Sequence, residues 1–316
     1  EYLMQLYVPG PDTTISGVHQ LRPGQAMKIS DGRVELLRYY SPEEDLRSSQ
    51  SWTMNEAAKE VLHTFEETVN AHLVSDVPLG LFLSGVLDSA SLLAIMAKSQ
   101  NGPIKTFSIG YEHPSDQSFS ELESARFVAT HFKTAHAETI LRPDAVSLIS
   151  KVVEGMGEPF ADSSAIPTYL VSEVARQTVT VALSGIGGDE LFGGYPRYLG
   201  LRTAAQYQYL PQRLRERVAK WSQHLDGGET SRDQAGRLKR FLQDGHLSLQ
   251  EQYRRWTTFI PAEWNGALWG ERLEAMFVGD RPLGPTDMLF DQWPSSDPAN
   301  CAMGVDLQSY LPDDLL

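Results

Sequence analysis

The spacing of hydrophobic residues changes several times along the chain, and each change predicts an element. Thr53-Met54-Asn55-Glu56 has the pattern of a capping box, and the apolar residues from Ala58 to Leu73 recur at helical spacing. Short apolar runs then alternate with longer amphipathic stretches. The runs predict strands at 79–83, 104–109, 137–141 and 179–183, and the stretches predict helices at 89–98, 121–132, 143–156 and 164–176. This alternation predicts an α/β fold with a parallel sheet and helices on both faces.

The two ends of the chain have different patterns. Leu6 to Val8 predicts a short strand, and Asp31-Gly32 separates two apolar runs as in a β-hairpin. Residues 41–52 are polar and serine-rich, which is typical of a linker. Residues 201–278 have a helical pattern, with tryptophans as the expected packing anchors: Trp221, Trp256, Trp264 and Trp269. Residues 279–300 are rich in proline, aspartate and serine, which predicts an ordered surface loop or a mobile segment.

Composition narrows the class of protein. The chain has 316 residues, of which 41% are hydrophobic, and its net charge is −14. That charge argues against non-specific nucleic-acid binding, but a few local amides and a metal ion are enough to hold a small phosphate ligand. The single cysteine, Cys301, excludes a disulfide framework and favours the reducing cytoplasm. The sequence contains no run of eighteen apolar residues, so it predicts no membrane-spanning helix.

The first candidate site is the segment Leu83-Ser84-Gly85-Val86-Leu87-Asp88-Ser89, between a predicted strand and a predicted helix. A short turn there directs backbone N–H groups and a helix N-terminus at one point, which favours an anion. The hydroxyls of Ser84 and Ser89 can bind phosphate oxygens. Asp88 would reach them through Mg²⁺, which prefers carboxylate and phosphate oxygens. The alternative is an ordinary turn in which Asp88 and Ser89 cap the helix.

The second candidate site follows the strand predicted at 179–183. It begins with Leu183-Ser184-Gly185-Ile186, and five of the ten positions from 185 to 194 are glycine. It repeats the order of the first segment: a strand, Ser-Gly, a tight turn and then an acidic residue, Asp189. Two such loops at one edge of a parallel sheet suit a clamp for Mg²⁺ and pyrophosphate. The alternative is a glycine-rich loop of structural origin.

These two segments resemble the pyrophosphate loop and the second loop of the glutamine-hydrolysing asparagine synthetases. Residues 105–110, 158–169 and 310–316 resemble further segments of that family, in the same order. The resemblance implies a fold like that of the adenine nucleotide alpha hydrolases (the PP-loop type). By this resemblance, residues 1–50 are the end of a glutaminase-type domain plus a linker. Residues 51–316 are an ATP-binding synthetase domain, with a sheet core at 51–200 and an incomplete, mainly helical part at 201–316.

The resemblance also implies an activity. ATP activates the carboxylate of aspartate as an acyl-adenylate, pyrophosphate leaves, and ammonia from glutamine displaces AMP to give asparagine. ATP and Mg²⁺ are therefore expected, and a homodimer is expected by analogy. The residues carried over for ATP are Leu83, Ser84, Gly85, Ser89, Ile109, Ser184 and Gly185, with Asp88 and Asp189 for the metal. Glu158 and Asp162 are expected to border the acceptor pocket, although Asp162 could instead cap the helix at 164–176.

Three departures from the family pattern bear on activity. Val86 stands where the family has a second glycine, and its branched Cβ resists the conformations that glycine allows. Ile186 stands where the family has an acidic residue, so no catalytic residue is intact. The sequence also ends before the family's catalytic lysine and lacks its N-terminal cysteine nucleophile, so we expect no glutamine hydrolysis by this piece alone. Two alternatives stay open: a relative that adenylates another carboxylate, and a nucleotide-binding protein without catalysis.

Overall fold

The computed structural model describes residues 2–43, 51–112, 121–141, 147–225, 234–260, 264, 270, 285–293 and 295–316. Contacts between residues divide the chain into two compact units. One unit is residues 49–186, and the other combines residues 1–48 with residues 187–316. We call them the sheet unit and the helical unit. The domain boundaries expected at residues 50 and 200 stay predictions.

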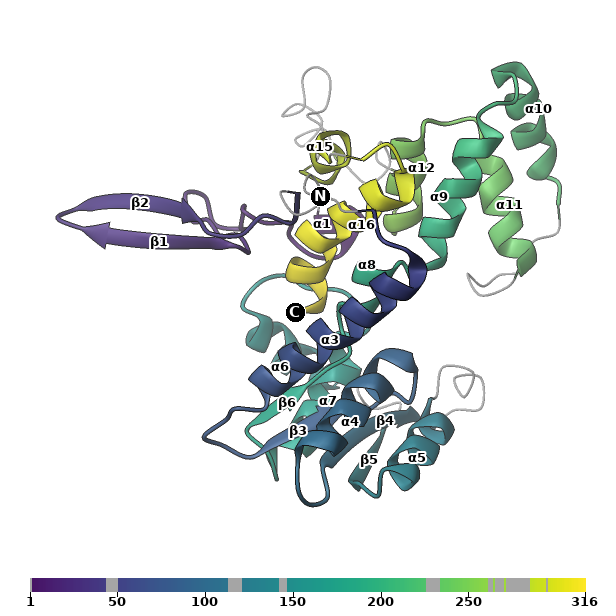
Figure 1. Cartoon of the computed structure of the whole chain (residues 1–316). Coiled ribbons are helices and arrows are strands. Elements are labelled where there is room, and N and C mark those ends of the chain that lie inside the picture. The colour runs from purple at the N-terminus through teal and green to yellow at the C-terminus, as the bar shows by residue number, and fades with distance from the viewer. Residues whose placement is uncertain are drawn as a thin grey trace. The chain divides into compact units, whose positions relative to one another are not determined.

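A four-stranded parallel sheet forms the centre of the sheet unit (Figure 1). Its strands are β3 (Leu79–Phe82), β4 (Lys105–Tyr111), β5 (Ala135–Leu141) and β6 (Val181–Leu183), in the order β5-β4-β3-β6. Leu81 on β3 pairs with Thr106 on one side and with Leu183 on the other. The carboxyl end of β3 therefore lies between those of β4 and β6, and the predicted parallel sheet is confirmed.

Helices cover both faces of this sheet, as the pattern predicts. On one face, Leu81 and Leu83 pack against α3 (Met54–His72), α4 (Leu87–Ser99) and α5 (Leu122–His131). On the other face, Phe82 and Phe107 pack against α7 (Ala165–Arg176), which follows α6 (Ile149–Met156). Helix α3 begins with the expected capping box, in which Thr53 and Glu56 bond reciprocally.

The helical unit is built around the long helices that follow residue 195. They are α9 (Pro196–Tyr207), α10 (Gln212–Ser222), α11 (Gln234–Asp244), α12 (Leu249–Thr257), α15 (Pro285–Gln292) and α16 (Pro298–Gln308). Shorter helices are α1 (Tyr2–Gln5), α8 (Gly188–Phe192) and a π-helical turn at Leu311–Leu315. Its core packs Tyr198 and Leu201 of α9 against Tyr253 of α12 and Val305 of α16.

The hairpin predicted around Asp31-Gly32 is confirmed. Strands β1 (Gln25–Ser30) and β2 (Arg33–Arg38) pair in antiparallel register and form a two-stranded ribbon (Figure 1). In the described part of the chain these two strands pair only with each other. Their apolar side chains are exposed on both faces, including Ile29 at 68% on one face and Leu37 at 45% on the other.

Two predictions of local structure are wrong. Leu6 to Val8 is not a strand, because the N–H of Leu6 bonds to the carbonyl of Tyr2 (2.7 Å) and Leu6 ends α1 with a positive φ of 71°. The described residues of 279–300 include α15 and the start of α16 rather than a loop. Pro298 opens α16 and the Asp297 carboxylate accepts from the N–H of Ala299 at 2.9 Å. Proline and aspartate there are signals for a helix start.

The expected tryptophan anchors divide into two kinds. Trp256 packs against the core around Tyr198, as predicted. Trp221 and Trp264 are each 60% exposed, so they are not anchors, and Trp269 lies outside the described residues. The buried tryptophan is instead Trp293, which is 6% exposed and lies so close to Gly304 that a Cβ there would be 2.1 Å from the indole ring.

Candidate functional site

The hydroxyl of Ser89 organises the first Ser-Gly loop, which connects β3 to α4. Its oxygen accepts from the backbone N–H groups of Ser84 (3.2 Å) and Gly85 (3.3 Å). The hydroxyl oxygen of Ser84 lies 2.8 Å from the same atom. Ser89 is only 2% exposed. Two amides and a second hydroxyl thus converge on the Ser89 oxygen at the end of β3, and the anion site stays a prediction.

Gly85 is the position in this loop where no larger residue fits without strain. Its φ is +81°, and a Cβ on it would lie 2.3 Å from the backbone nitrogen of Ala125 in α5. Val86 has a φ of −84° and a ψ of 173°, an extended conformation that a branched residue adopts without strain. Val86 is the N-cap residue of α4, which has no side-chain cap. Asp88 and Ser89 lie inside the first turn and do not cap the helix, but the Ser89 hydroxyl holds the turn that precedes it, so the alternative of an ordinary strand-to-helix turn stays open.

The second Ser-Gly loop begins directly beside the first, because β6 pairs with β3. A Cβ on Gly185 would lie 2.9 Å from the backbone nitrogen of Ser89 and 3.1 Å from the Cβ of Asp88. The N–H of Ile186 bonds to the hydroxyl of Ser184 (3.3 Å), and Ile186 itself is 46% exposed. The structure therefore brings together six of the sequence candidates: Ser84, Gly85, Asp88, Ser89, Ser184 and Gly185.

Leu83 directly follows β3 and Ile109 lies within the neighbouring strand β4, and the two side chains pack on opposite faces of the sheet. Leu83 is 1% exposed and belongs to the core beneath α4. Its carbonyl accepts from the hydroxyl of Ser108. Ile109 is half-buried and packs on the side of α7. The two side chains therefore do not form one continuous wall.

Glu158 and Asp162 lie between α6 and α7. The carboxylate of Asp162 accepts from the N–H of Ser164 at 2.6 Å, just before α7 begins. Asp162 does not cap α7, whose N-cap residue is Ser164 without a side-chain cap, but its carboxylate stabilises the turn before the helix. Glu158 is half-buried and follows Gly157, which ends α6 with a φ of 73°. Their place beside an acceptor pocket stays a prediction.

Asp189 is held by the glycines around it, in the helical unit. Gly187 precedes α8 with a φ of 96°, and Gly193 ends it with a φ of 74°. A Cβ on Gly194 would lie 1.8 Å from a carboxylate oxygen of Asp189. The backbone geometry thus explains why three positions of the second segment are glycine: two have a positive φ, and the third has no room for a Cβ. Asp88 belongs to the sheet unit, and its convergence with Asp189 on one metal stays a prediction.

The carboxylate next to Asp189 has a different environment. Glu190 is 1% exposed and accepts from the hydroxyl of Tyr195 at 2.9 Å. Burial raises the pKa of the Glu190 carboxyl above its usual value. Glu190 therefore fixes the loop to α9, which begins directly after Tyr195, while Asp189 is only partly buried.

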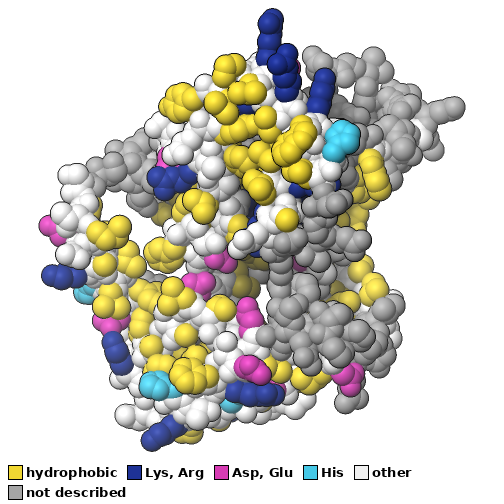
Figure 2. Space-filling view, turned by 90° about the vertical axis from the view of Figure 1, so that its right-hand side faces the viewer, with side chains coloured by type: hydrophobic (Ala, Val, Ile, Leu, Met, Phe, Trp, Pro, Cys, Tyr) yellow, Lys and Arg dark blue, Asp and Glu magenta, His cyan; other side chains and the backbone are white. Residues whose placement is uncertain are grey.

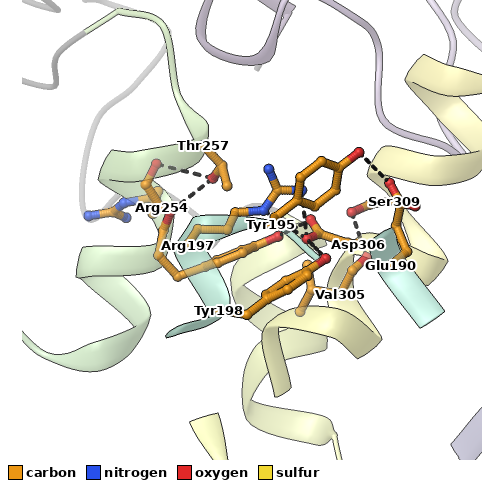
Figure 3. Close-up of polar contacts among 10 residues, drawn as sticks. Glu190, Tyr195, Arg197, Tyr198, Arg254, Thr257, Val305, Asp306 and Ser309 are labelled. Atoms are coloured by element: carbon orange, nitrogen blue, oxygen red, sulfur yellow. Dashed lines mark hydrogen bonds and ion pairs between the residues drawn. The ribbon is translucent and has the colours of Figure 1, made fainter. Parts of the chain in front are cut away.

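A buried carboxylate that sequence reasoning missed lies at the centre of the helical unit (Figure 3). Asp306 is 1% exposed and accepts from the hydroxyls of Tyr198 (2.5 Å) and Tyr253 (2.6 Å). It also accepts from Nε (3.0 Å) and Nη2 (2.8 Å) of Arg197. Burial and the nearby carboxylate raise the pKa of Tyr198. The sequence feature that could have identified Asp306 is that it is the one acidic residue within the apolar run 301–307.

In the described part of the chain, no three or more His, Cys, Asp or Glu side chains are grouped so that they could hold a metal ion. Two carboxylates that act with phosphate oxygens are a different arrangement, and one that suits Mg²⁺. The helices that the structure describes also include none long and apolar enough to cross a membrane.

A parallel α/β sheet with a Ser-Gly loop at its carboxyl edge defines the PP-loop class of fold. The sequence model of the asparagine synthase family matches residues 60–316. The chain belongs to that family.

Individual relatives agree with this assignment. Asparagine synthetase [glutamine-hydrolyzing] 1 of Bacillus subtilis is 32% identical over 80% of this chain and 38% of its own length. A putative asparagine synthetase [glutamine-hydrolyzing] of Mycobacterium tuberculosis is 31% identical over 100% of this chain and 46% of its own length. A putative asparagine synthetase of Methanocaldococcus jannaschii is 34% identical over 66% of this chain. The chain spans less than half the length of the first two.

The close contact at Gly85 generates a testable prediction. Gly85→Ala should lower the free energy of unfolding by about 2–5 kcal/mol, because it combines the strain of a positive φ with overpacking against Ala125. The matched control is Gly102→Ala, since Gly102 has a φ of +110° and nothing within 4 Å of an added Cβ. It should cost only about 1–2 kcal/mol. Urea unfolding measures both, and equal losses would contradict the contact.

Proposed function

We propose that this chain is the ATP-binding part of an enzyme that forms an amide after adenylating a carboxylate. The observation that carries the proposal is the meeting of two Ser-Gly loops at the carboxyl edge of one parallel sheet, where Gly185 lies against Asp88 and Ser89. The chain's family and the names of its relatives supply the reaction class. Aspartate is the proposed acceptor and glutamine-derived ammonia the proposed nitrogen source. A cytoplasmic location and a homodimer stay expectations.

The residues of the first loop are suited to the pyrophosphate end of ATP. The N–H groups of Ser84 and Gly85 already converge on the Ser89 hydroxyl, at the N-terminus of α4. To bind a phosphate oxygen, these N–H groups would exchange the Ser89 oxygen for the phosphate, close to the positive end of the helix dipole. Ser184 and Gly185 would bind the nucleotide from the adjacent strand. Leu83 would lie beneath it, and Ile109 would contact the adenine side.

Asp88 and Asp189 are the proposed ligands of Mg²⁺. Asp88 is half-buried beside Ser89, and Asp189 follows Gly185 by four residues, a stretch of chain that spans at most about 14 Å. A magnesium ion held there would neutralise the negative charge that develops on departing pyrophosphate. The role of these two side chains is to hold the ion and fix its position.

The first chemical step needs little from the protein besides orientation and charge neutralisation. An acceptor carboxylate is already ionised at neutral pH, so its oxygen can attack the α-phosphorus without a general base. The bond from that phosphorus to the pyrophosphate oxygen then breaks. The rate acceleration then comes from holding the two reactants in line and from stabilising the leaving group.

A second candidate function is favoured by Ile186. Its side chain is 46% exposed at the end of the second loop, where it offers neither a metal ligand nor a proton acceptor. In that case the chain binds nucleotide but does not turn it over. A third candidate, adenylation of a carboxylate other than aspartate, shares the same loops and differs in the acceptor pocket.

Exchange of labelled pyrophosphate into ATP separates these functions, in full-length protein with a panel of carboxylates. Exchange that depends on aspartate supports the leading proposal, and exchange that depends on another acid supports the relative. ATP binding without any exchange supports the non-catalytic protein. Asp88→Asn should lower exchange by about a hundredfold or more, because a ligand of the metal is lost. Asp76→Asn, at an exposed turn of the same unit, is the control and should leave exchange unchanged.

The two departures from the family pattern should have separate effects. Val86→Gly should tighten the binding of ATP–Mg²⁺ by about tenfold to a hundredfold, because it restores one charge-assisted hydrogen bond worth about 1.5–3 kcal/mol. Ile186→Glu should raise turnover in full-length protein with little change in affinity, because the backbone of the loop is already in place. Calorimetric titration of ATP against both variants measures the affinities. Unchanged affinity in Val86→Gly would show that this position does not limit pyrophosphate binding.

A further inference from the structure

We propose that Glu190 and Tyr195 are positioning residues, which hold the carboxylate of Asp189 in place for the metal ion. The inference rests on the proposed function, in which Asp189 is a magnesium ligand, and it assigns a role to two further residues that act through it. All three residues belong to the helical unit. They lie in one short segment that contains α8 and leads to α9.

The backbone of this segment brings the carboxylate of Asp189 against Gly194. The carbonyl of Asp189 accepts from the N–H groups of Gly193 (2.9 Å) and Gly194 (3.1 Å), which closes the turn after α8. A Cβ added to Gly194 would lie 1.8 Å from Oδ1 of Asp189. The direction of the carboxylate therefore depends on where Gly194 lies, and Gly194 directly precedes Tyr195 in the chain.

A side-chain hydrogen bond closes the same segment a second time. The hydroxyl of Tyr195 donates to Oε1 of Glu190 at 2.9 Å, and these two residues directly follow Gly194 and Asp189 in the chain. The two sides of the contact between Asp189 and Gly194 are thus joined through their neighbours. Glycine has no side chain that restricts its backbone, so a bond across Gly193 and Gly194 helps the segment to keep one conformation.

The ring of Tyr195 is itself held by its neighbours in the helical unit (Figure 3). The guanidinium of Arg197 lies 3.9 Å from the centroid of that ring, and the rings of Tyr198 and Tyr310 lie 5.7 Å and 6.2 Å away. Arg197 is fixed in turn by its ion pair with the buried carboxylate of Asp306, at 2.8 Å. The arginine is therefore already paired, and its flat face packs on the ring. The hydroxyl of Tyr195 thus belongs to a side chain with a fixed position.

The burial of Glu190 suits positioning rather than ligation. Glu190 is 1% exposed, whereas Asp189 is half-buried. The surface of the helical unit carries side chains of other kinds: on the face that α9, α10 and α11 form, Lys and Arg lie beside hydrophobic residues (Figure 2). A metal ion needs a carboxylate oxygen that it can reach, so Glu190 acts through the segment that it holds.

The test removes only the hydroxyl that makes this bond. In full-length protein with ATP present, Tyr195→Phe should raise the Kd of Mn²⁺ by about tenfold or more, as is typical when a residue that orients a metal ligand is lost. Mn²⁺ replaces Mg²⁺ because its binding can be followed by water-proton relaxation. Glu190→Leu should raise the Kd to a similar extent. Glu190→Gln should rescue most of the affinity, because its amide oxygen can still accept from the hydroxyl of Tyr195.

The matched control removes a comparable buried bond elsewhere in the same unit. The indole N–H of Trp256 donates to Oδ2 of Asp244 at 3.0 Å, and Asp244 is 7% exposed. Trp256→Phe should lower the midpoint of urea unfolding but leave the Kd of Mn²⁺ unchanged. Urea unfolding of the variants at positions 190 and 195 shows in the same way that each of them is folded.

Asp189→Asn separates failure of this inference from failure of the proposed function. If Asp189→Asn keeps full affinity for Mn²⁺, Asp189 is not a ligand and both proposals are wrong. If Asp189→Asn weakens binding but Tyr195→Phe does not, only the positioning role is wrong. Equal losses in Glu190→Gln and Glu190→Leu would also overturn it, because the charge of Glu190 would then matter and not its bond to Tyr195. A loss in Trp256→Phe as large as in Tyr195→Phe would overturn it too, since it would indicate general damage to the unit.

Discussion

The parallel pairing of β3 with β6 is the interaction on which the candidate site depends. It puts the ends of the two strands side by side, so the segments that follow them must meet. Glycine makes the meeting possible at two points. Gly85 lets the first loop lie against Ala125 of α5, and Gly185 lets the second loop lie against Asp88 and Ser89. A larger residue at position 85 would push the first loop away from α5, and one at position 185 would separate the two loops.

The helical unit depends on a different interaction, the buried carboxylate of Asp306. Four donors from Arg197, Tyr198 and Tyr253 satisfy it, and these residues come from two other helices. Removing one partner would leave a buried charge incompletely paired, which costs about 3–5 kcal/mol in comparable cases. The guanidinium of Arg197 also lies 3.9 Å from the ring centroid of Tyr195, whose hydroxyl holds Glu190. The network therefore connects α16 and α12 to the segment that carries Asp189.

Local patterns were enough to predict the sheet and the first loop. The four strands are apolar runs bounded by turns, and Ser84, Gly85 and Ser89 are residue types with a direct reason to lie at an anion site. Contacts between distant parts of the chain could not be predicted in this way. The partners of Asp306 are 53 to 109 residues away in sequence. Proline and aspartate near residue 297 were ambiguous, because the same residues begin helices and form loops.

The central proposal is that Asp88 and Asp189 hold one metal ion together with ATP. The most direct measurement is the affinity for Mn²⁺, used in place of Mg²⁺ and followed by electron paramagnetic resonance with ATP present. It compares the unchanged protein with Asp88→Asn, Asp189→Asn and the double variant. If the two carboxylates share one ion, each single change should weaken binding by about tenfold or more, and the double change should cost clearly less than the product of the two. Independent, multiplying effects, or full affinity in Asp189→Asn, would contradict a shared metal site.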